Sequence, residues 1–78
     1  MRNKPLDQLF GENLVFCRKK HRPGPCYKVA PELDMSPQSL KRREDGDTAI
    51  TLSDVWVMSE RWGVSFSQLC SELGEGIA

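Results

Sequence analysis

The three cysteines and the single histidine of this sequence could form a zinc site, with Cys17, His21 and Cys26 as ligands and Cys70 as a fourth. Cys17 and His21 are four residues apart, a spacing that places two ligands on one face of a helix. The three cysteines, however, form no Cys-x-x-Cys pair, and Cys17 falls on an apolar stripe, where a free cysteine packs as a small hydrophobe. We therefore expect neither a bound metal nor a cofactor.

Catalysis is not favoured by the same residues. His21 is the only histidine, and no serine or cysteine stands at a recognisable spacing that would pair it with a nucleophile. The carboxylates are scattered, and no glycine-rich phosphate loop is present. The sequence thus predicts a protein that is not an enzyme and has no small-molecule substrate.

A second group of polar side chains has the chemistry of nucleic-acid recognition: Gln38, Ser39, Lys41, Arg42 and Arg43. Glutamine can form a bidentate pair with adenine, and arginine with guanine, in the major groove of DNA. Lysine and arginine also neutralise phosphates. An isolated basic triplet is more often a solvated helix face, so the elements that present these residues decide between the two interpretations.

The segment that carries them has clear helix signals. Ser36 can cap a helix, Pro37 suits its first position, and Gly46 can end it. On such a helix, residues 36–45, Leu40 points to the core. The polar side chains around it can then lie on the outward side.

Apolar spacing predicts two helices before this one. The first carries Leu6, Phe10, Leu14 and Cys17 on one stripe and is stopped by Pro23-Gly24-Pro25. The second runs from Tyr27 to Leu33 but contains Pro31, which is tolerated only in the first turn of a helix. This helix therefore either begins late, near Lys28 or Val29, or is kinked. Asp34 and Met35 then form the turn.

Two more helices are predicted after it. Thr51 or Ser53 can cap a fourth helix that ends at Gly63, and Ser65 can cap a fifth. The residues expected to face inward are Leu52, Val55, Met58 or Ser59, Trp62, Phe66, Leu69 and Leu73. The prediction is an all-α fold of five short helices in one domain, residues 6–73. A flexible N-terminus (1–5) and a flexible C-terminal tail (74–78) flank it.

The net charge of the 78-residue chain is zero, but the charges are unevenly distributed. Residues 1–43 hold ten Lys/Arg and four Asp/Glu, whereas residues 44–78 hold one and seven. This asymmetry indicates one basic and one acidic face, and only the basic face could neutralise phosphates. The odd cysteine number indicates a reducing compartment. Without a signal peptide or a long apolar run, we expect a cytoplasmic protein that does not associate with a membrane.

In ordered succession these pieces resemble a known family. Its first helix is similar to Phe10-Gly11-x-x-Leu14-x-x-Cys17-Arg18. Its recognition unit is similar to Val29-Ala30-x-x-Leu33-x-Met35-Ser36-Pro37-x-Ser39-Leu40-x-Arg42-x-Glu44-x-Gly46. Its last two helices are similar to Leu52-x-x-Val55-x-x-Met58-x-x-x-Trp62-Gly63-Val64-Ser65-Phe66-x-x-Leu69. Over residues 6–73 the chain resembles the phage repressor/Cro-like (XRE-type) helix-turn-helix family, with its lambda-repressor-like fold.

The resemblance implies a sequence-specific DNA-binding transcriptional regulator, a repressor or autoregulator, that reads the major groove of double-stranded DNA with helix 36–45. It implies base contacts from Gln38, Ser39 and Arg42, a phosphate contact from Ser36, and a bracing pair between Arg18 and Glu44. From charge and position alone we assign Lys28, Lys41 and Arg43 to phosphates. A homodimer is expected. Trp56 and Val57 are its possible interface, or else peripheral core.

Several features depart from the family pattern. Pro25-Cys26-Tyr27 stands where the family usually has a phosphate-binding glutamine, and Arg43 stands at a position that is usually apolar. Together with the zero net charge and the extra apolar residues, these departures favour an alternative: a helix-turn-helix domain repurposed as a protein–protein interaction module. Binding that weakens steeply with salt would distinguish DNA recognition from an apolar protein contact.

Overall fold

A computed structural model describes residues 5–76 of the chain. They form five α-helices, one 3-10 helix and no strand, so the predicted all-α class is confirmed. The elements are α1 (Leu6–His21), α2 (Cys26–Val29), the 3-10 helix η1 (Ala30–Leu33), α3 (Pro37–Asp45), α4 (Leu52–Trp62) and α5 (Phe66–Leu73). Most of the two termini predicted to be flexible, residues 1–4 and 77–78, lies outside the described residues.

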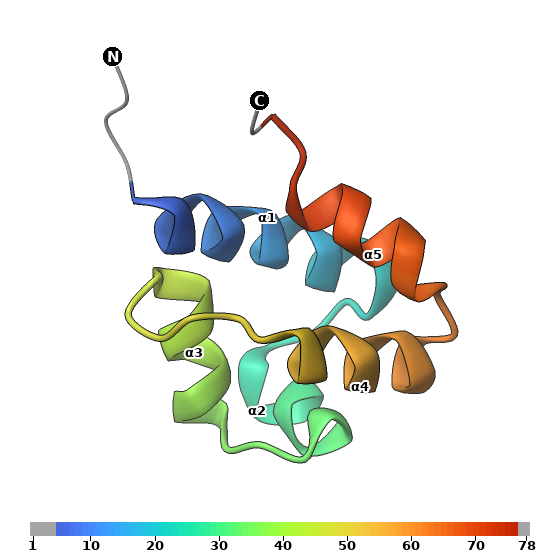
Figure 1. Cartoon of the computed structure of the whole chain (residues 1–78). Helices are drawn as coiled ribbons and strands as arrows, with labels where there is room; N and C mark the ends of the chain where they lie inside the picture. The colour runs from blue at the N-terminus through green and yellow to red at the C-terminus, as the bar shows by residue number, and fades with distance from the viewer. Residues whose placement is uncertain (1–4, 77–78) are drawn as a thin grey trace.

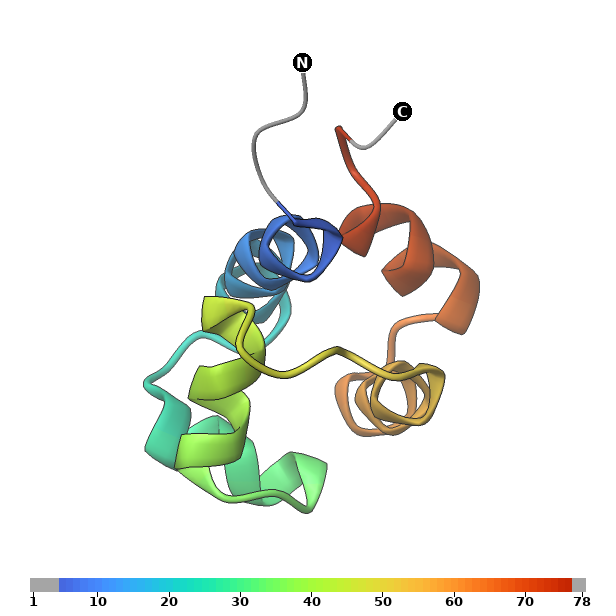
Figure 2. The ribbon, with the colours of Figure 1, turned by 60° about the vertical axis from the view of Figure 1, so that its left-hand side comes forward.

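Helix α1 lies in contact with both α3 and α5. Both pack against it, as Figures 1 and 2 show. Helix α4 packs against α5 and η1, which places it across the molecule from α1. The short α2 and η1 lie beside α3 and complete the layer below α1. No helix within residues 5–76 is long and apolar enough to cross a membrane.

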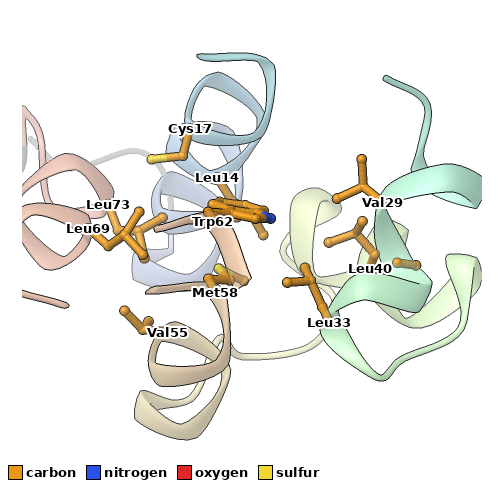
Figure 3. Packing of buried hydrophobic residues seen from close by; sticks show 11 residues of the cluster. Leu14, Cys17, Val29, Leu33, Leu40, Val55, Met58, Trp62, Leu69 and Leu73 are labelled. Atoms are coloured by element: carbon orange, nitrogen blue, oxygen red, sulfur yellow. The ribbon is translucent and has the colours of Figure 1, made fainter. Parts of the chain in front are cut away.

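One hydrophobic core lies where these helices meet (Figure 3). Its fully buried large side chains are Leu14, Leu40, Met58 and Leu69. Trp62 lies among side chains of α1, α3 and α5 in the same cluster. Two residues predicted to face inward do not: Leu6 is 51% exposed and Leu52 is 73% exposed. Both are first residues of their helices.

The helix boundaries follow the predicted capping residues. The Ser36 hydroxyl accepts a hydrogen bond from the Ser39 amide at 3.1 Å, and the Ser65 hydroxyl caps α5 in the same way. Of the two candidates for α4, Thr51 is the cap. Gly46 and Gly63 end α3 and α4 with φ of 84° and 70°, which glycine adopts at little cost.

The second helix differs from both predicted forms. It begins early, at Cys26, and after one turn it changes from an α-helix to a 3-10 helix at Ala30. Pro31 then stands in the first turn of the 3-10 segment, where its missing N–H costs little. Asp34 ends the segment with a left-handed φ of 58°, and the chain turns into α3.

Candidate nucleic-acid interface

The inner face of α3 is packed closely against α1. Leu40 is fully buried, and Glu44 is 7% exposed. A Cβ atom on Gly11 of α1 would lie 2.6 Å from the carbonyl oxygens of Arg43 and Glu44, closer than side-chain atoms tolerate. Glycine at position 11 therefore permits the two helices to approach, and it sets the position of the C-terminal end of α3.

A buried ion pair fixes α3 to α1 a second time. Arg18 Nε donates to Glu44 Oε2 at 2.5 Å, and Arg18 Nη2 donates to Glu44 Oε1 at 3.2 Å. Another nitrogen of Arg18 donates to the carbonyl of Gly24, and the Cys26 thiol lies 3.7 Å from Glu44 Oε1. The hydrogen bond with Glu44 raises the pKa of Arg18 despite burial. Glu44 thus braces the helix, as the family resemblance implied.

Arg43 is held from the opposite side, by α4. Its Nε donates to Asp54 Oδ2 at 2.9 Å, and its Nη1 donates to the Ser39 carbonyl at 3.0 Å. The same oxygen of Asp54 accepts from the backbone amide of Thr51 in the α4 capping box. The Arg43 guanidinium, which charge and position assigned to phosphate, is therefore engaged within the chain, where it links α3 to the start of α4.

The outer face of α3 carries the remaining polar side chains. Gln38 and Arg42 are exposed and one helical turn apart, and Ser39 is partly buried. Lys41 is also exposed, and its Nζ donates to both Asp45 carboxylate oxygens at 2.8 and 3.0 Å, an interaction that raises its pKa. Gln38, Lys41 and Arg42 line one open hollow together with Pro37 of α3 and Cys26 of α2.

The other two predicted contact residues lie at the edges of this surface. Ser36 is exposed at the start of α3, where its hydroxyl serves as the cap and donates to Ser39 Oγ at 3.1 Å. Lys28 is exposed on α2 and is not among the residues that line the hollow. The structure therefore brings Gln38, Lys41 and Arg42 together most directly.

A second exposed surface lies on α4 and the start of α5. Leu52 and Trp56 are 73% and 56% exposed, and the rings of Trp56 and Phe66 are 6.0 Å apart. Val57 is partly buried, packs against the core and lines a shallow hollow with these residues. We call Leu52, Trp56, Val57 and Phe66 the apolar patch. Sequence reasoning found Trp56 and Val57 but expected Leu52 and Phe66 to be internal.

The cysteine and histidine of α1 belong to a network with α5. Glu72 Oε1 lies 3.4 Å from the Cys17 thiol and 2.8 Å from His21 Nε2. Burial opposes ionisation of Glu72, but hydrogen bonds from Gln68, His21 and Lys20 lower its pKa to about 2. Burial and the contact with Glu72 raise the pKa of Cys17 to about 12. Within residues 5–76 no His, Cys, Asp or Glu side chains are grouped to hold a metal ion.

Sequence reasoning did not identify two residues that make these contacts, Asp54 and Glu72. Asp54 stands three residues after Thr51, which is capping-box spacing and could have identified it as part of the α4 start. No local signal indicates its pairing with Arg43 or that of Glu72 with α1.

No protein-family model, curated protein or solved structure matches this chain. The fold and its residues define a small all-α protein in which one helix is braced on two sides and presents a polar, cationic outer face. Its function is inferred from that geometry.

Proposed function

We propose that this chain is a sequence-specific regulator of transcription, of the repressor/Cro-like helix-turn-helix type, that binds double-stranded DNA through α3. The observation that supports this function most directly is the division of α3 into two faces. Leu40, Glu44 and Arg43 are held by α1 and α4, whereas Gln38 and Arg42 are free to reach a partner. A rigid helix with exposed polar side chains suits the major groove, which is about 12 Å wide.

The preceding elements support the same function. The chain passes from η1 through a left-handed residue, Asp34, into α3, which makes two helical segments joined by a tight turn (Figure 1). Arg61 of α4 donates to the Asp34 carboxylate at 3.0 Å and ties this turn to the rest of the domain. Base contacts are assigned to Gln38, Ser39 and Arg42, and phosphate contacts to Ser36, Lys28 and Lys41.

A homodimer completes the proposal. One α3 helix reads too few base pairs for useful specificity, and a two-fold pair would place two such helices about 34 Å apart on a near-palindromic site. The apolar patch is the surface we assign to that contact, because Leu52 and Trp56 expose large apolar side chains side by side with Phe66. Sedimentation of the wild type and of Trp56→Glu tests it: the variant should be monomeric, and a wild type that stays monomeric on DNA contradicts the dimer.

The same patch supports a second function, a helix-turn-helix domain that binds another protein. In that case α3 would be a structural helix whose cations are engaged within the chain, as Lys41 and Arg43 are with Asp45 and Asp54. The two functions differ in their response to salt. Counterion release makes DNA binding fall steeply as salt rises, whereas an apolar contact barely responds.

Selection from a random duplex DNA library, followed by rebinding at several salt concentrations, tests the proposal. We expect an enriched near-palindrome whose binding is lost in Arg42→Ala. Lys20→Ala is the matched control, because it also removes one positive charge but lies on the α5 side of α1, paired with Glu72. Absence of any enriched sequence, or equal losses in both variants, would exclude sequence-specific DNA recognition by α3.

A further inference from the structure

The hollow between α2 and α3 has an apolar lining whose role the proposed polar contacts to DNA do not explain. Pro37 and Cys26 line it together with Gln38, Lys41 and Arg42, and most of its exposed lining is apolar. The Cys26 thiol is directed towards Glu44, and its burial and that carboxylate raise its pKa, so it is neutral. The result is an open, largely apolar depression that three polar side chains also line.

A phosphate is a poor occupant for this depression. Pro37 has no backbone N–H to donate, and the amide of Ser39 is already bonded to the Ser36 hydroxyl. The Lys41 ammonium at the rim is held by Asp45 at 2.8 Å. An oxyanion could bond to Gln38 or Arg42, which also line the hollow. Against Pro37 and Cys26 it finds no donor, because the Cys26 thiol is directed at Glu44, so it would lose water there without a replacing hydrogen bond, and this is unfavourable.

The edges of base pairs in the major groove expose one apolar group, the 5-methyl group of thymine. Gln38 and Arg42 are one turn apart on α3 and both line the depression, so a base edge next to the bases that they contact would lie over it. We propose that the hollow between α2 and α3 receives the 5-methyl group of a thymine, which packs against Pro37 and Cys26. This proposal rests on the proposed function. The outer face of α3 would then recognise thymine through an apolar contact, in addition to the hydrogen bonds that it makes to other bases.

The test uses the duplex selected above, in which each thymine is replaced in turn by deoxyuridine. Deoxyuridine keeps every hydrogen-bonding group and lacks only the methyl group. Burial of one methyl group predicts that wild-type binding weakens about three- to fourfold at one thymine in each half-site. The effect should nearly disappear in Pro37→Ala and in Cys26→Ala, because each removes part of the apolar surface that the methyl group contacts.

Cys70→Ala is the matched control, because Cys70 is an exposed cysteine of α5 that does not line this hollow. It should retain the full response to deoxyuridine, and thermal melting should show that all three variants are folded. If no thymine responds, the inference is wrong although selective DNA binding stands. If one responds equally in wild type, Pro37→Ala and Cys26→Ala, the methyl group is read elsewhere and the inference is again wrong. If no duplex is enriched at all, the proposed function itself fails.

Discussion

Replacing Glu44 by alanine tests the brace that positions α3. The change leaves the Arg18 guanidinium buried, with the Gly24 carbonyl as its remaining partner, because both side chains of the pair are at most 10% exposed. Removing one partner of a buried ion pair costs about 3 to 5 kcal/mol. A domain of this size has a total stability of roughly 4 to 12 kcal/mol. The variant should therefore lose about a quarter or more of its unfolding free energy.

The thermal midpoint translates this loss into an observable. For a domain of 60 to 100 residues, 1 kcal/mol shifts Tm by about 4 to 8 °C, so the loss of about 3 to 5 kcal/mol in Glu44→Ala should lower Tm by about 12 to 40 °C. Urea unfolding followed by circular dichroism gives the free energy itself. The exposed pair between Arg22 and Glu32, 40% and 44% exposed, provides the control: Glu32→Ala should cost less than about 1 kcal/mol.

A double variant separates the loss of attraction from the cost of an unpaired charge. Arg18→Met with Glu44→Leu fills the site with apolar side chains, and such replacements are often neutral or stabilising. It should recover most of the stability that either single change loses. Glu44→Ala with wild-type stability and altered base preference would refute the reasoning, because Glu44 would then read DNA instead of bracing α3.

Three further changes test other contacts of the fold. The pKa of Glu72, lowered to about 2 from 4.5, makes its stabilisation complete above about pH 5 and lost as the pH falls towards 2. Urea unfolding of Glu72→Gln should therefore show an unfolding free energy about 1 to 2 kcal/mol lower at pH 7, after allowance for solvent screening. The unfolding free energy of this variant should also depend less on acid pH than that of wild type. An equal dependence in both proteins contradicts this prediction. Gly11→Ala should lower the unfolding free energy by about 1 to 3 kcal/mol, because its Cβ would meet backbone oxygens of α3. Gly74→Ala is the control: its Cβ would lie 3.4 Å from the nearest atom, so the change should be tolerated. Asp54→Asn keeps an acceptor for the α4 cap but removes the charge facing Arg43, so it should lower the unfolding free energy by about 1 to 2 kcal/mol. The same loss in an Arg43→Met background would disprove the coupling between Asp54 and Arg43.

Local chemistry made the ends of most helices predictable. Ser36 and Ser65 cap, Gly46 and Gly63 terminate, and each effect depends on residues within one turn of the chain. The inward position of Leu40 followed from the same helix start. The sequence therefore located α3 and the exposed positions of Gln38, Lys41 and Arg42 correctly, whereas Ser39, expected on the outward side, is partly buried.

Residues whose environment depends on distant parts of the chain were predicted less well. Leu52 fits the apolar stripe of α4, but as its first residue it extends past the elements that cover Val55 and Met58. Arg43 departs from the apolar residue expected at its position, and the structure explains the departure by its partner Asp54, eleven residues further on. The chain changes to a 3-10 helix at Ala30, one residue before Pro31, which has no N–H for the α-helical hydrogen bond. Periodicity carries no information on any of these.

Ion pairing within the fold explains how a chain of zero net charge can present a cationic helix face. Four acidic residues from the second half pair with cations from the first half, namely Glu44 with Arg18, Asp45 with Lys41, Asp54 with Arg43 and Glu72 with Lys20. Glu44 and Asp54 are thus engaged at buried or half-buried sites and Glu72 on α5, whereas Asp45 pairs with Lys41 on the exposed side of α3. Of the three cations of α3, Arg42 makes no ion pair within residues 5–76.

This pairing limits how strongly salt can affect DNA binding. If Lys28 and Lys41 contact phosphates while Arg42 contacts a base, a protomer neutralises about two phosphates and a dimer about four, which gives a slope of log affinity against log salt near −4. Lys41→Ala should reduce the slope by about two, and Lys20→Ala should leave it unchanged. A slope steeper than about −8 would mean that cations such as Arg43 leave their partners on DNA. An unchanged slope in Lys41→Ala would mean that Asp45 keeps Lys41 away from the phosphates.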